Sequence, residues 1–285
     1  MASKRDTSQV LNERLKCKIC ETGPRAGKSH WYQCYDRHDI CQDCLEVAKN
    51  KNCSCGKPIS KVFCATTEEL LKLDLMRFKC INTSRGCKEI FGEKAMISHE
   101  EDCIYRLVPC PNDRCQVKVP FHELLDHMKE KEKHFTDSLV NEGGKFIDYS
   151  SLKGSTRGFS FIPEKIEFDD RVFFLGGIRF EGKETLHFWI QLYGSKYEAK
   201  NYYYTLEFHG IDPNIKDVYT RQAISVDETS DEIMKTNKCF GIKFDIFKAQ
   251  FMDENCNYKI SISIRNMKEE VKDENVESGI SDNDE

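Results

Sequence analysis

Four residues that can bind a metal ion lie close together in the segment QCYDRHDICQDC, namely Cys34, His38, Cys41 and Cys44. Thiols and imidazoles at such spacing form disulfides, act as redox or catalytic groups, or hold a metal. The 285-residue chain starts without an apolar stretch like a secretion signal and has no run of about 18 apolar residues that could span a membrane. We therefore expect the reducing cytosol or nucleus, where disulfides are rare, and favour metal binding.

The first cysteine-rich segment contains enough ligands for two metal sites. In chain order they are Cys17, Cys20, Cys34, His38, Cys41, Cys44, Cys53 and Cys55. CKIC and CQDC each place two residues between their thiols, which lets both sulfurs reach one zinc ion at about 2.3 Å. Sulfur-rich sites favour zinc over magnesium or calcium. The last pair, CSC, has a shorter spacing, and Cys64 is an alternative ligand there.

A second ligand pattern occurs twice between residues 80 and 134. The first copy is Cys80, Cys87, His99 and Cys103, and the second is Cys110, Cys115, His127 and His134, with His122 as the alternative last ligand. Eleven residues separate the second cysteine from the first histidine in both copies. Each copy is predicted to be a hairpin-like loop followed by a helix that carries the histidine. Four protein ligands close a zinc site, so these zincs are expected to be structural.

The same segment lacks the charge of a nucleic-acid-binding protein. Residues 80–134 contain nine Lys and Arg against ten Asp and Glu, so no basic face is available for phosphates and we expect no nucleic-acid binding. The cysteines left over, Cys64, Cys239 and Cys256, are expected to be small buried apolar residues. The segment 267–285 has eight acidic and two basic residues, which predicts a disordered tail.

After about residue 140 the hydrophobic pattern alternates with a period of two. The expected inward faces are Ile260, Ile262 and Ile264 in KISISIRN, Tyr204, Leu206 and Phe208 in YYYTLEF, and Ile242, Phe244 and Ile246 in GIKFDIF. RVFFLGGIRF and LHFWIQLYG are further strands. Several short alternating strands between turn signals predict an antiparallel β-sandwich. We find no glycine-rich phosphate loop and no Ser/His/Asp or Cys/His catalytic set in this half.

The order of these segments resembles the seven in absentia family of RING-type ubiquitin ligases, from Cys17 to Arg265. The resemblance implies a zinc-rich α+β protein. Its expected parts are an N-terminal arm (1–16), a RING finger (17–64), a helical linker (65–79), tandem zinc fingers of the family type (80–134), an antiparallel TRAF-like substrate-binding sandwich (135–266) and the acidic tail (267–285). Residues 145–170 match the family's substrate groove poorly, which leaves the substrate open.

The resemblance also assigns roles to residues. In the family the RING ligands alternate between two zincs, which implies Cys17, Cys20, Cys41 and Cys44 for one ion and Cys34, His38, Cys53 and Cys55 for the other. Four zincs are then expected in the whole chain. Ile19 and Pro58 would contact a ubiquitin-conjugating enzyme, and catalysis would come from positioning its ubiquitin thioester, with no nucleophile in this chain.

Further expectations concern partners and a rival function. The family implies ubiquitin, protein substrates destined for proteasomal degradation and a homodimer, in the cytoplasm or also the nucleus. The CSC spacing and Gly56, which stands where active members often carry a basic residue, favour the alternative of a non-catalytic adaptor built on the same zinc scaffold.

Overall fold

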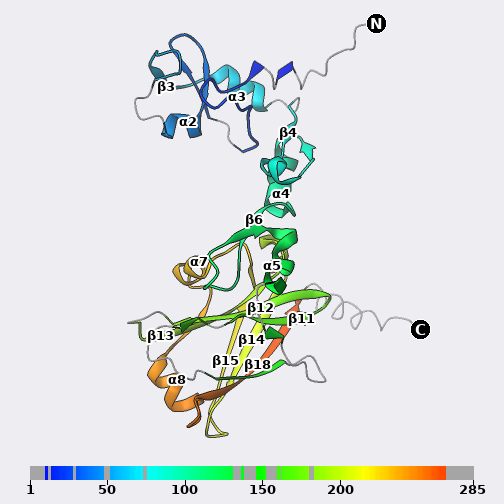
Figure 1. The fold of residues 1–285 in the computed structure, drawn as a ribbon, viewed down its shortest axis with the longest axis vertical. Helices are drawn as coiled ribbons and strands as arrows, with labels where there is room; N and C mark the ends of the chain where they lie inside the picture. Colours follow the sequence, from blue (N-terminus) through cyan, green and yellow to red (C-terminus); the bar gives the residue numbers. More distant parts are fainter. Residues whose placement is uncertain are drawn as a thin grey trace, which may run out of the picture. The chain divides into compact units, whose positions relative to one another are not determined.

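The computed structural model describes residues 10–11, 14–27, 30–47, 52–72, 76–130, 136–137, 146–151, 159–160, 162–179 and 183–267. The chain divides into two compact units, 1–106 and 107–285 (Figure 1). No helix among the described residues is long and apolar enough to cross a membrane. Most of the acidic tail, from residue 268 onward, and the first nine residues of the arm lie outside the described residues.

The first unit begins with a small three-stranded sheet that carries the first cysteine cluster. Its antiparallel strands lie in the order β2-β1-β3. The elements are β1 (Trp31–Cys34), β2 (Asp39–Cys41), α2 (Gln42–Val47), β3 (Ile59–Phe63) and α3 (Ala65–Lys72). The sheet is small, and each strand contributes one buried apolar side chain beside the cysteines, namely Trp31, Ile40 and Ile59.

The first zinc-finger segment completes this unit. It consists of β4 (Phe78–Lys79), the 3-10 helix η1 (Ile81–Arg85), β5 (Ile90–Phe91) and α4 (Glu93–Asp102), with β4 and β5 paired as an antiparallel hairpin. Phe78 and Met96 from this segment share one hydrophobic cluster with Trp31 and Ile40. The first finger therefore packs with the preceding sheet.

The second finger belongs to the second unit. It consists of β6 (Leu107–Pro109), β7 (Lys118–Pro120), η2 (Phe121–Glu123) and α5 (Leu124–Glu130), and β6 pairs with β7. Val108 and Leu124 of the finger pack in one cluster with Phe174 and Val226 of the sandwich. The two fingers, which the sequence groups as one tandem segment, thus share their cores with different neighbours.

Two sheets form the sandwich. The larger has the order β16-β13-β12-β11-β8, with β10 also paired to β12 and β17 to β13, and the smaller has the order β15-β14-β18-β9. The strands are β8 (Thr136–Asp137), β9 (Phe146–Ser151), β10 (Phe159–Ser160), β11 (Glu164–Phe168), β12 (Arg171–Arg179), β13 (Thr185–Leu192), β14 (Tyr202–His209), β15 (Lys216–Gln222), β16 (Ile224–Ser225), β17 (Phe240–Lys243) and β18 (Asn257–Asn266). Short helices are α6 (Lys196–Ala199), α7 (Ser230–Lys235) and α8 (Phe244–Phe251).

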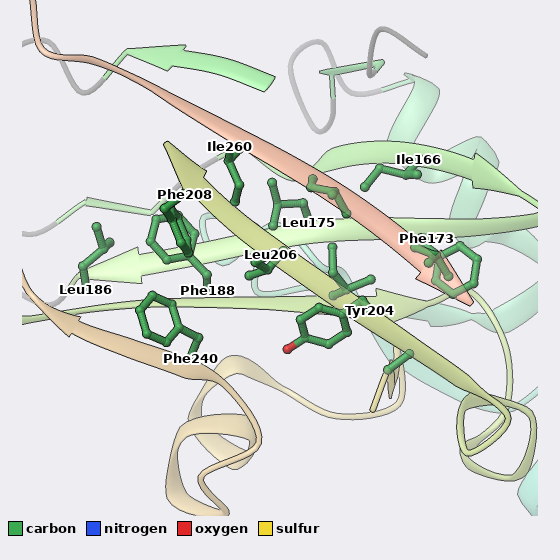
Figure 2. Close-up of a cluster of buried hydrophobic side chains, with 14 of the residues drawn as sticks. Ile166, Phe173, Leu175, Leu186, Phe188, Tyr204, Leu206, Phe208, Phe240 and Ile260 are labelled. Carbon is green, nitrogen blue, oxygen red and sulfur yellow. The ribbon is translucent and has the colours of Figure 1, made fainter. Parts of the chain in front are cut away.

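The core lies between the two sheets, as the alternation predicted. Figure 2 shows Phe173 and Phe188 of the larger sheet facing Leu206, Phe208 and Ile260 of the smaller one, and all five are fully buried or nearly so. Along β14 buried and half-buried residues alternate without a break, because successive side chains of a strand point to opposite faces.

The sandwich is mainly antiparallel, as expected, with two short parallel pairings, β11 with β8 and β13 with β16. One expectation needs correction. GIKFDIF is not one strand: β17 ends at Lys243 and α8 begins at Phe244. Phe247 and Phe251, four residues apart, are the buried positions there, while Ile246 is exposed, so the helical period prevails over a short alternation.

Candidate metal centres

The eight candidate ligands of residues 17–55 meet in two interleaved groups. Cys17, Cys20, Cys41 and Cys44 form one, and Cys34, His38, Cys53 and Cys55 form the other, with all ligand atoms of a group within 4.8 Å of one another. These are the two sets that the resemblance implies. β1 ends in a ligand of one group and β2 ends in a ligand of the other, so neighbouring strands of one short sheet carry ligands of both groups.

The spacing of the donor atoms fits a tetrahedral metal site. Metal–sulfur bonds of about 2.3 Å place two tetrahedral sulfurs about 3.8 Å apart, whereas a disulfide requires about 2.05 Å. In the structure the Sγ–Sγ distances are 3.8 Å for Cys20–Cys41, 3.8 Å for Cys34–Cys55 and 3.7 Å for Cys80–Cys103. All fifteen cysteines are free thiols. The geometry therefore favours metal over disulfides in this chain.

The short CSC pair reaches its group through a tight turn. The Cys53 amide donates to the Lys57 carbonyl and the Gly56 amide donates to the Cys53 carbonyl, both at 2.8 Å. Gly56 has a φ of 81°, in the left-handed region that favours glycine. Cys64 lies outside the group and accepts a hydrogen bond from Thr67 Oγ1 at 3.1 Å. The turn explains why a glycine follows the last thiol.

The first finger assembles a complete set of four ligands. Cys80 and Cys87 flank η1 between β4 and β5, His99 lies on α4, and Cys103 caps the end of that helix. Cys87 Sγ lies 3.3 Å from His99 Nε2. The predicted loop-then-helix order thus holds for this copy, and all four donors meet at one point.

In the second finger three of the predicted ligands come together. Cys110 and Cys115 lie between β6 and β7, and His127 lies on α5 with its Nε2 3.5 Å from Cys115 Sγ. His134 lies outside the described residues. His122 Nε2 instead lies 3.4 Å from a carboxylate oxygen of Glu123, away from the three-ligand group.

The pKa values of the thiols show that most of these groups disfavour several negative charges unless a cation is bound. Burial, reinforced by the neighbouring thiols, raises the pKa of Cys80 and of Cys110 to about 12, and burial raises that of Cys41 to about 11. In Cys20 burial acts in the same direction, but hydrogen bonds, first with Thr22 and then with Cys44 and Cys17, outweigh it and lower the pKa to about 7. Clustered thiolates repel one another, and a bound dication relieves that repulsion.

The two proposed contact residues lie at the surface beside these groups. Ile19 is 37% exposed, and Pro58 is exposed directly before β3. Ser54 Oγ donates to the Lys18 carbonyl at 3.0 Å, which ties the turn around CSC to the loop that carries Ile19. The sequence analysis did not single out Ser54, for which a hydroxyl residue between two ligand thiols is the only sequence signal.

Two family descriptions match this sequence. The Sina zinc finger matches residues 72–146 and the Sina TRAF-like domain matches residues 167–263. The chain belongs to the seven in absentia (Sina) family. The predicted zinc fingers and TRAF-like sandwich are thereby confirmed. The zinc-finger match covers the two Cys/His groups that begin at Cys80 and at Cys110, which supports zinc binding there.

Curated relatives carry the same family name. The chain is 25% identical over 218 residues to the E3 ubiquitin-protein ligase SINAT3 of Arabidopsis thaliana, covering 72% of this chain and 62% of the relative. It is 26% identical over 273 residues to the ligase siah-1 of Caenorhabditis briggsae (91% and 58%) and 25% identical over 246 residues to the ligase sina of Drosophila virilis (81% and 72%). The matched part thus spans about 60% of the length of the first and second of these relatives.

Proposed function

We propose that the chain is a RING-type ubiquitin-protein ligase. Residues 17–64 would recruit a ubiquitin-charged conjugating enzyme, and the sandwich of residues 135–266 would recruit protein substrates for ubiquitination and proteasomal degradation. The observation that carries the proposal is the pair of interleaved ligand groups, which hold Ile19 and Pro58 at the surface. The names of the relatives agree with it.

The proposed chemistry needs no nucleophile from this chain. A docked conjugating enzyme already carries ubiquitin as a thioester, and holding that thioester in a reactive posture lowers the entropic part of the barrier. Ile19 would supply apolar contact area and Pro58 a rigid edge, while the Ser54–Lys18 hydrogen bond fixes the distance between their loops. Zinc would act structurally, since four protein ligands leave no position for a reactive water.

Four zinc ions complete this proposal. Two would be held by residues 17–55, one by the set from Cys80 to Cys103, and one by Cys110, Cys115, His127 and the outlying His134. Native mass spectrometry of the reduced protein should find four ions. If the protein binds only three zinc ions and His134→Ala also binds three, His134 is not a zinc ligand.

A self-ubiquitination assay with a panel of conjugating enzymes tests the ligase directly. His38→Ala should abolish chain formation because it opens the second ligand group. Ile19→Ala should reduce the rate about 5- to 30-fold with the zinc content unchanged, since an interface anchor contributes on the order of 1–2 kcal/mol. Ile90→Ala is the matched control, because Ile90 is 50% exposed in the first finger and outside the proposed contact.

The rival proposal is a non-catalytic adaptor of the same family. The CSC pair and Gly56 favour it, because the left-handed turn at Gly56 leaves no basic side chain directly after the last ligand. A zinc-loaded protein that forms no ubiquitin chains with any enzyme of the panel would establish the adaptor. Activity that His38→Ala removes would rule it out.

The test of substrate binding by the sandwich needs a longer fragment than the domain bounds predicted from sequence would give. Because the second finger shares a cluster with Phe174 and Val226, the fragment to test is 107–285 and not 135–285. It should capture substrates that residues 1–106 do not. Sedimentation at micromolar concentration should show the proposed homodimer, and a fluorescent fusion should show the proposed cytoplasmic or nuclear location.

A further inference from the structure

Two side chains of the sandwich that can bind a metal ion meet outside the predicted zinc groups. Cys239 Sγ lies 3.4 Å from His187 Nδ1. A metal bonded to a sulfur at about 2.3 Å and to a nitrogen at about 2.0 Å separates the two by about 3.5 Å at the tetrahedral angle. The thiol and the imidazole are therefore spaced as two ligands of one ion, like Cys87 and His99 at 3.3 Å.

The larger sheet holds the imidazole in place. His187 lies on β13, where it pairs with Ile178 of β12 and with Gly241 of β17. A side chain at Gly241 would come within 3.1 Å of His187 Nδ1, the nitrogen that faces the thiol. Glycine at this position therefore leaves that nitrogen uncovered. Burial lowers the pKa of His187, so the ring is neutral at neutral pH and can act as a ligand.

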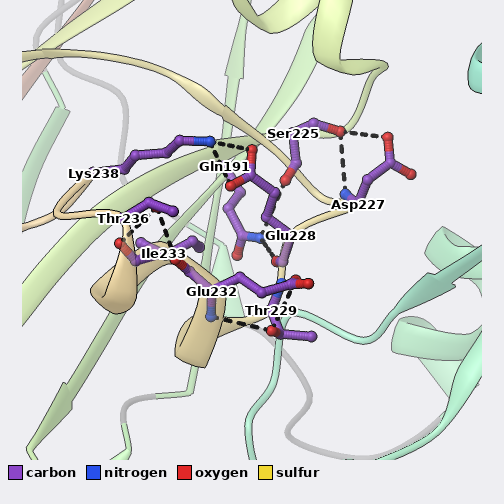
Figure 3. A network of polar contacts seen from close by, with 9 residues as sticks. All are labelled: Gln191, Ser225, Asp227, Glu228, Thr229, Glu232, Ile233, Thr236 and Lys238. Atoms are coloured by element: carbon purple, nitrogen blue, oxygen red, sulfur yellow. Dashed lines mark hydrogen bonds and ion pairs between the residues drawn. The ribbon is translucent and has the colours of Figure 1, made fainter.

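A tight turn after α7 brings the thiol to the same place. The Lys238 amide donates to the Ile233 carbonyl at 3.0 Å, and the Asn237 amide donates to the Met234 carbonyl at 3.1 Å. Asn237 has a φ of 54°, as expected for the left-handed residue of a helix end with this bonding pattern. Figure 3 shows Lys238 Nζ bonded to both carboxylate oxygens of Glu228, at 2.6 and 2.7 Å, which fixes the residue directly before the thiol.

Met234 adds a third soft donor beside the pair. Cys239, Trp189 and Ile233 share one buried cluster, and the partly buried Met234 packs against it. Thiolate and thioether ligands favour Cu(I), and imidazole also suits copper. Each predicted zinc group contains at least two cysteines, whereas this cluster contains one.

The charge around the thiol favours a monovalent ion. Cys239 is 4% exposed, and burial, the largest effect, raises its pKa. A backbone hydrogen bond and the nearby Arg221 guanidinium act in the opposite direction. One thiolate neutralises Cu(I) completely, whereas a dication would leave an excess positive charge that is buried and close to Arg221. The donor set and its surroundings thus agree on the ion.

A buried phenol lies near the thiol. Tyr204 is 1% exposed, and its hydroxyl is the one buried side-chain polar group among the described residues that has no hydrogen-bond partner. Burial raises the pKa of Tyr204, and the charge of an ionised Cys239 raises it further, so the hydroxyl is within electrostatic reach of the sulfur. An unsatisfied donor there favours the deprotonated sulfur that a metal ion requires.

We propose that His187, Met234 and Cys239 form a binding site for Cu(I) in the sandwich. When the ion binds, the S–H bond of Cys239 breaks, a sulfur–copper bond forms and the proton passes to solvent. His187 Nδ1 and the Met234 thioether donate lone pairs without a change of protonation, and copper keeps its oxidation state. The inference goes beyond the proposed ligase activity, because it needs neither ubiquitin nor a conjugating enzyme.

Trp189 offers a probe of this site, because it lies in the same cluster as Cys239. The chain contains one other tryptophan, Trp31. The zinc-loaded full chain would be labelled with 5-fluorotryptophan, and a Trp31→Phe variant would assign the two fluorine resonances. One equivalent of Cu(I), supplied anaerobically as the bicinchoninate complex, should shift the Trp189 resonance and leave that of Trp31 in place. Native mass spectrometry should find one copper added with no loss of zinc.

The variants separate the ligands from the fold. Cys239→Ser and His187→Asn should each abolish the Trp189 shift and the added copper. Met234→Leu, which keeps a similar side-chain volume, should weaken Cu(I) binding at least about tenfold in competition with bicinchoninate. Cys256→Ser is the matched control, since it removes the other thiol of the sandwich, which packs against a different cluster. An unchanged denaturation midpoint shows that each variant is folded.

Several outcomes would overturn the proposal. A Trp189 shift that Cys239→Ser retains would place the ion elsewhere. Copper that enters only as zinc leaves would mean that the zinc groups take up the ion. An equal shift with one added equivalent of zinc chloride would mean that the site does not select Cu(I). If no copper is added in competition with bicinchoninate, the thiol is only a hydrogen-bond donor to the imidazole.

Discussion

Six of the thirteen buried residues in the hydrophobic cluster of the first unit are cysteines, whereas none of the twenty-one in the cluster of the sandwich is. The first unit fills its interior with groups that repel one another once they ionise. The sandwich fills its interior with aromatic and aliphatic side chains that need no partner. This contrast teaches that one chain combines two sources of stability, metal coordination and apolar burial.

Removal of zinc is expected to have the largest effect, because it should affect the first unit and leave the sandwich intact. Removing zinc with a strong chelator should unfold the first unit, because each structural site contributes on the order of 10–16 kcal/mol of apparent folding free energy. The sandwich strands should remain folded. Hydrogen-exchange mass spectrometry should therefore show loss of protection in residues 31–47 and 76–102, with protection retained in 185–192 and 257–266. If residues 31–47 stay protected from hydrogen exchange after complete zinc removal, metal coordination is not the source of stability of the first unit.

The converse change removes apolar burial. Phe188 is 1% exposed and lies 5.1 Å from Phe208 and 5.7 Å from Phe247, ring centre to ring centre. Phe188→Ala should destabilise the sandwich by about 3–5 kcal/mol, since it removes a buried ring and leaves a cavity. Denaturant unfolding followed by Trp189 fluorescence in a Trp31→Phe background would measure it.

Ile246→Ala is the control for this variant. Ile246 is 46% exposed on α8, so its truncation should change stability by no more than about 0.5 kcal/mol. Neither variant should alter the zinc bound by residues 17–103. Zinc lost from those residues in Phe188→Ala would mean that the two sources of stability are coupled.

The sequence alone predicts the candidate metal ligands and the regularly alternating strands. The candidate ligands follow from spacing and residue type, because only a few residue types carry a thiol or an imidazole, whereas the division of the first eight into two interleaved groups is what the family resemblance implies. The strands with strict alternation, such as β14, follow from the period of two. These signals are local, and the structure agrees with them at Tyr204, Leu206 and Phe208.

What the sequence did not show depends on longer-range packing. Alternation at Ile242, Phe244 and Ile246 is too short to distinguish a strand from the helix that buries Phe247 and Phe251. The parallel pairings of β8 and β16 are two residues long and have no pattern of their own. The contact between His187 and Cys239 joins residues 52 positions apart in the chain, so no local motif announces it.

The second finger is where the two sources of stability meet, and it gives the smallest of the expected effects. Tyr193 of the sandwich stacks on Phe121 of the finger with ring centres 4.3 Å apart and planes 6° apart, and its hydroxyl donates to the Phe121 carbonyl at 2.9 Å. Tyr193→Phe keeps the ring contact and deletes the hydrogen bond. The sandwich should lose about 1 kcal/mol, and one equivalent of zinc should be released faster to a chromogenic chelator.

Tyr35→Phe is the matched control, because Tyr35 is 74% exposed in the first unit, and it should change neither quantity. The two readouts of Tyr193→Phe must move together if the finger and the sandwich fold as one unit. A loss of sandwich stability without faster zinc release would mean that the finger folds by itself on its metal. Faster zinc release without a loss of sandwich stability would mean that the sandwich stabilises the finger but the finger does not stabilise the sandwich. Either result would mean that the sandwich, beginning after α5, is stable without the second finger.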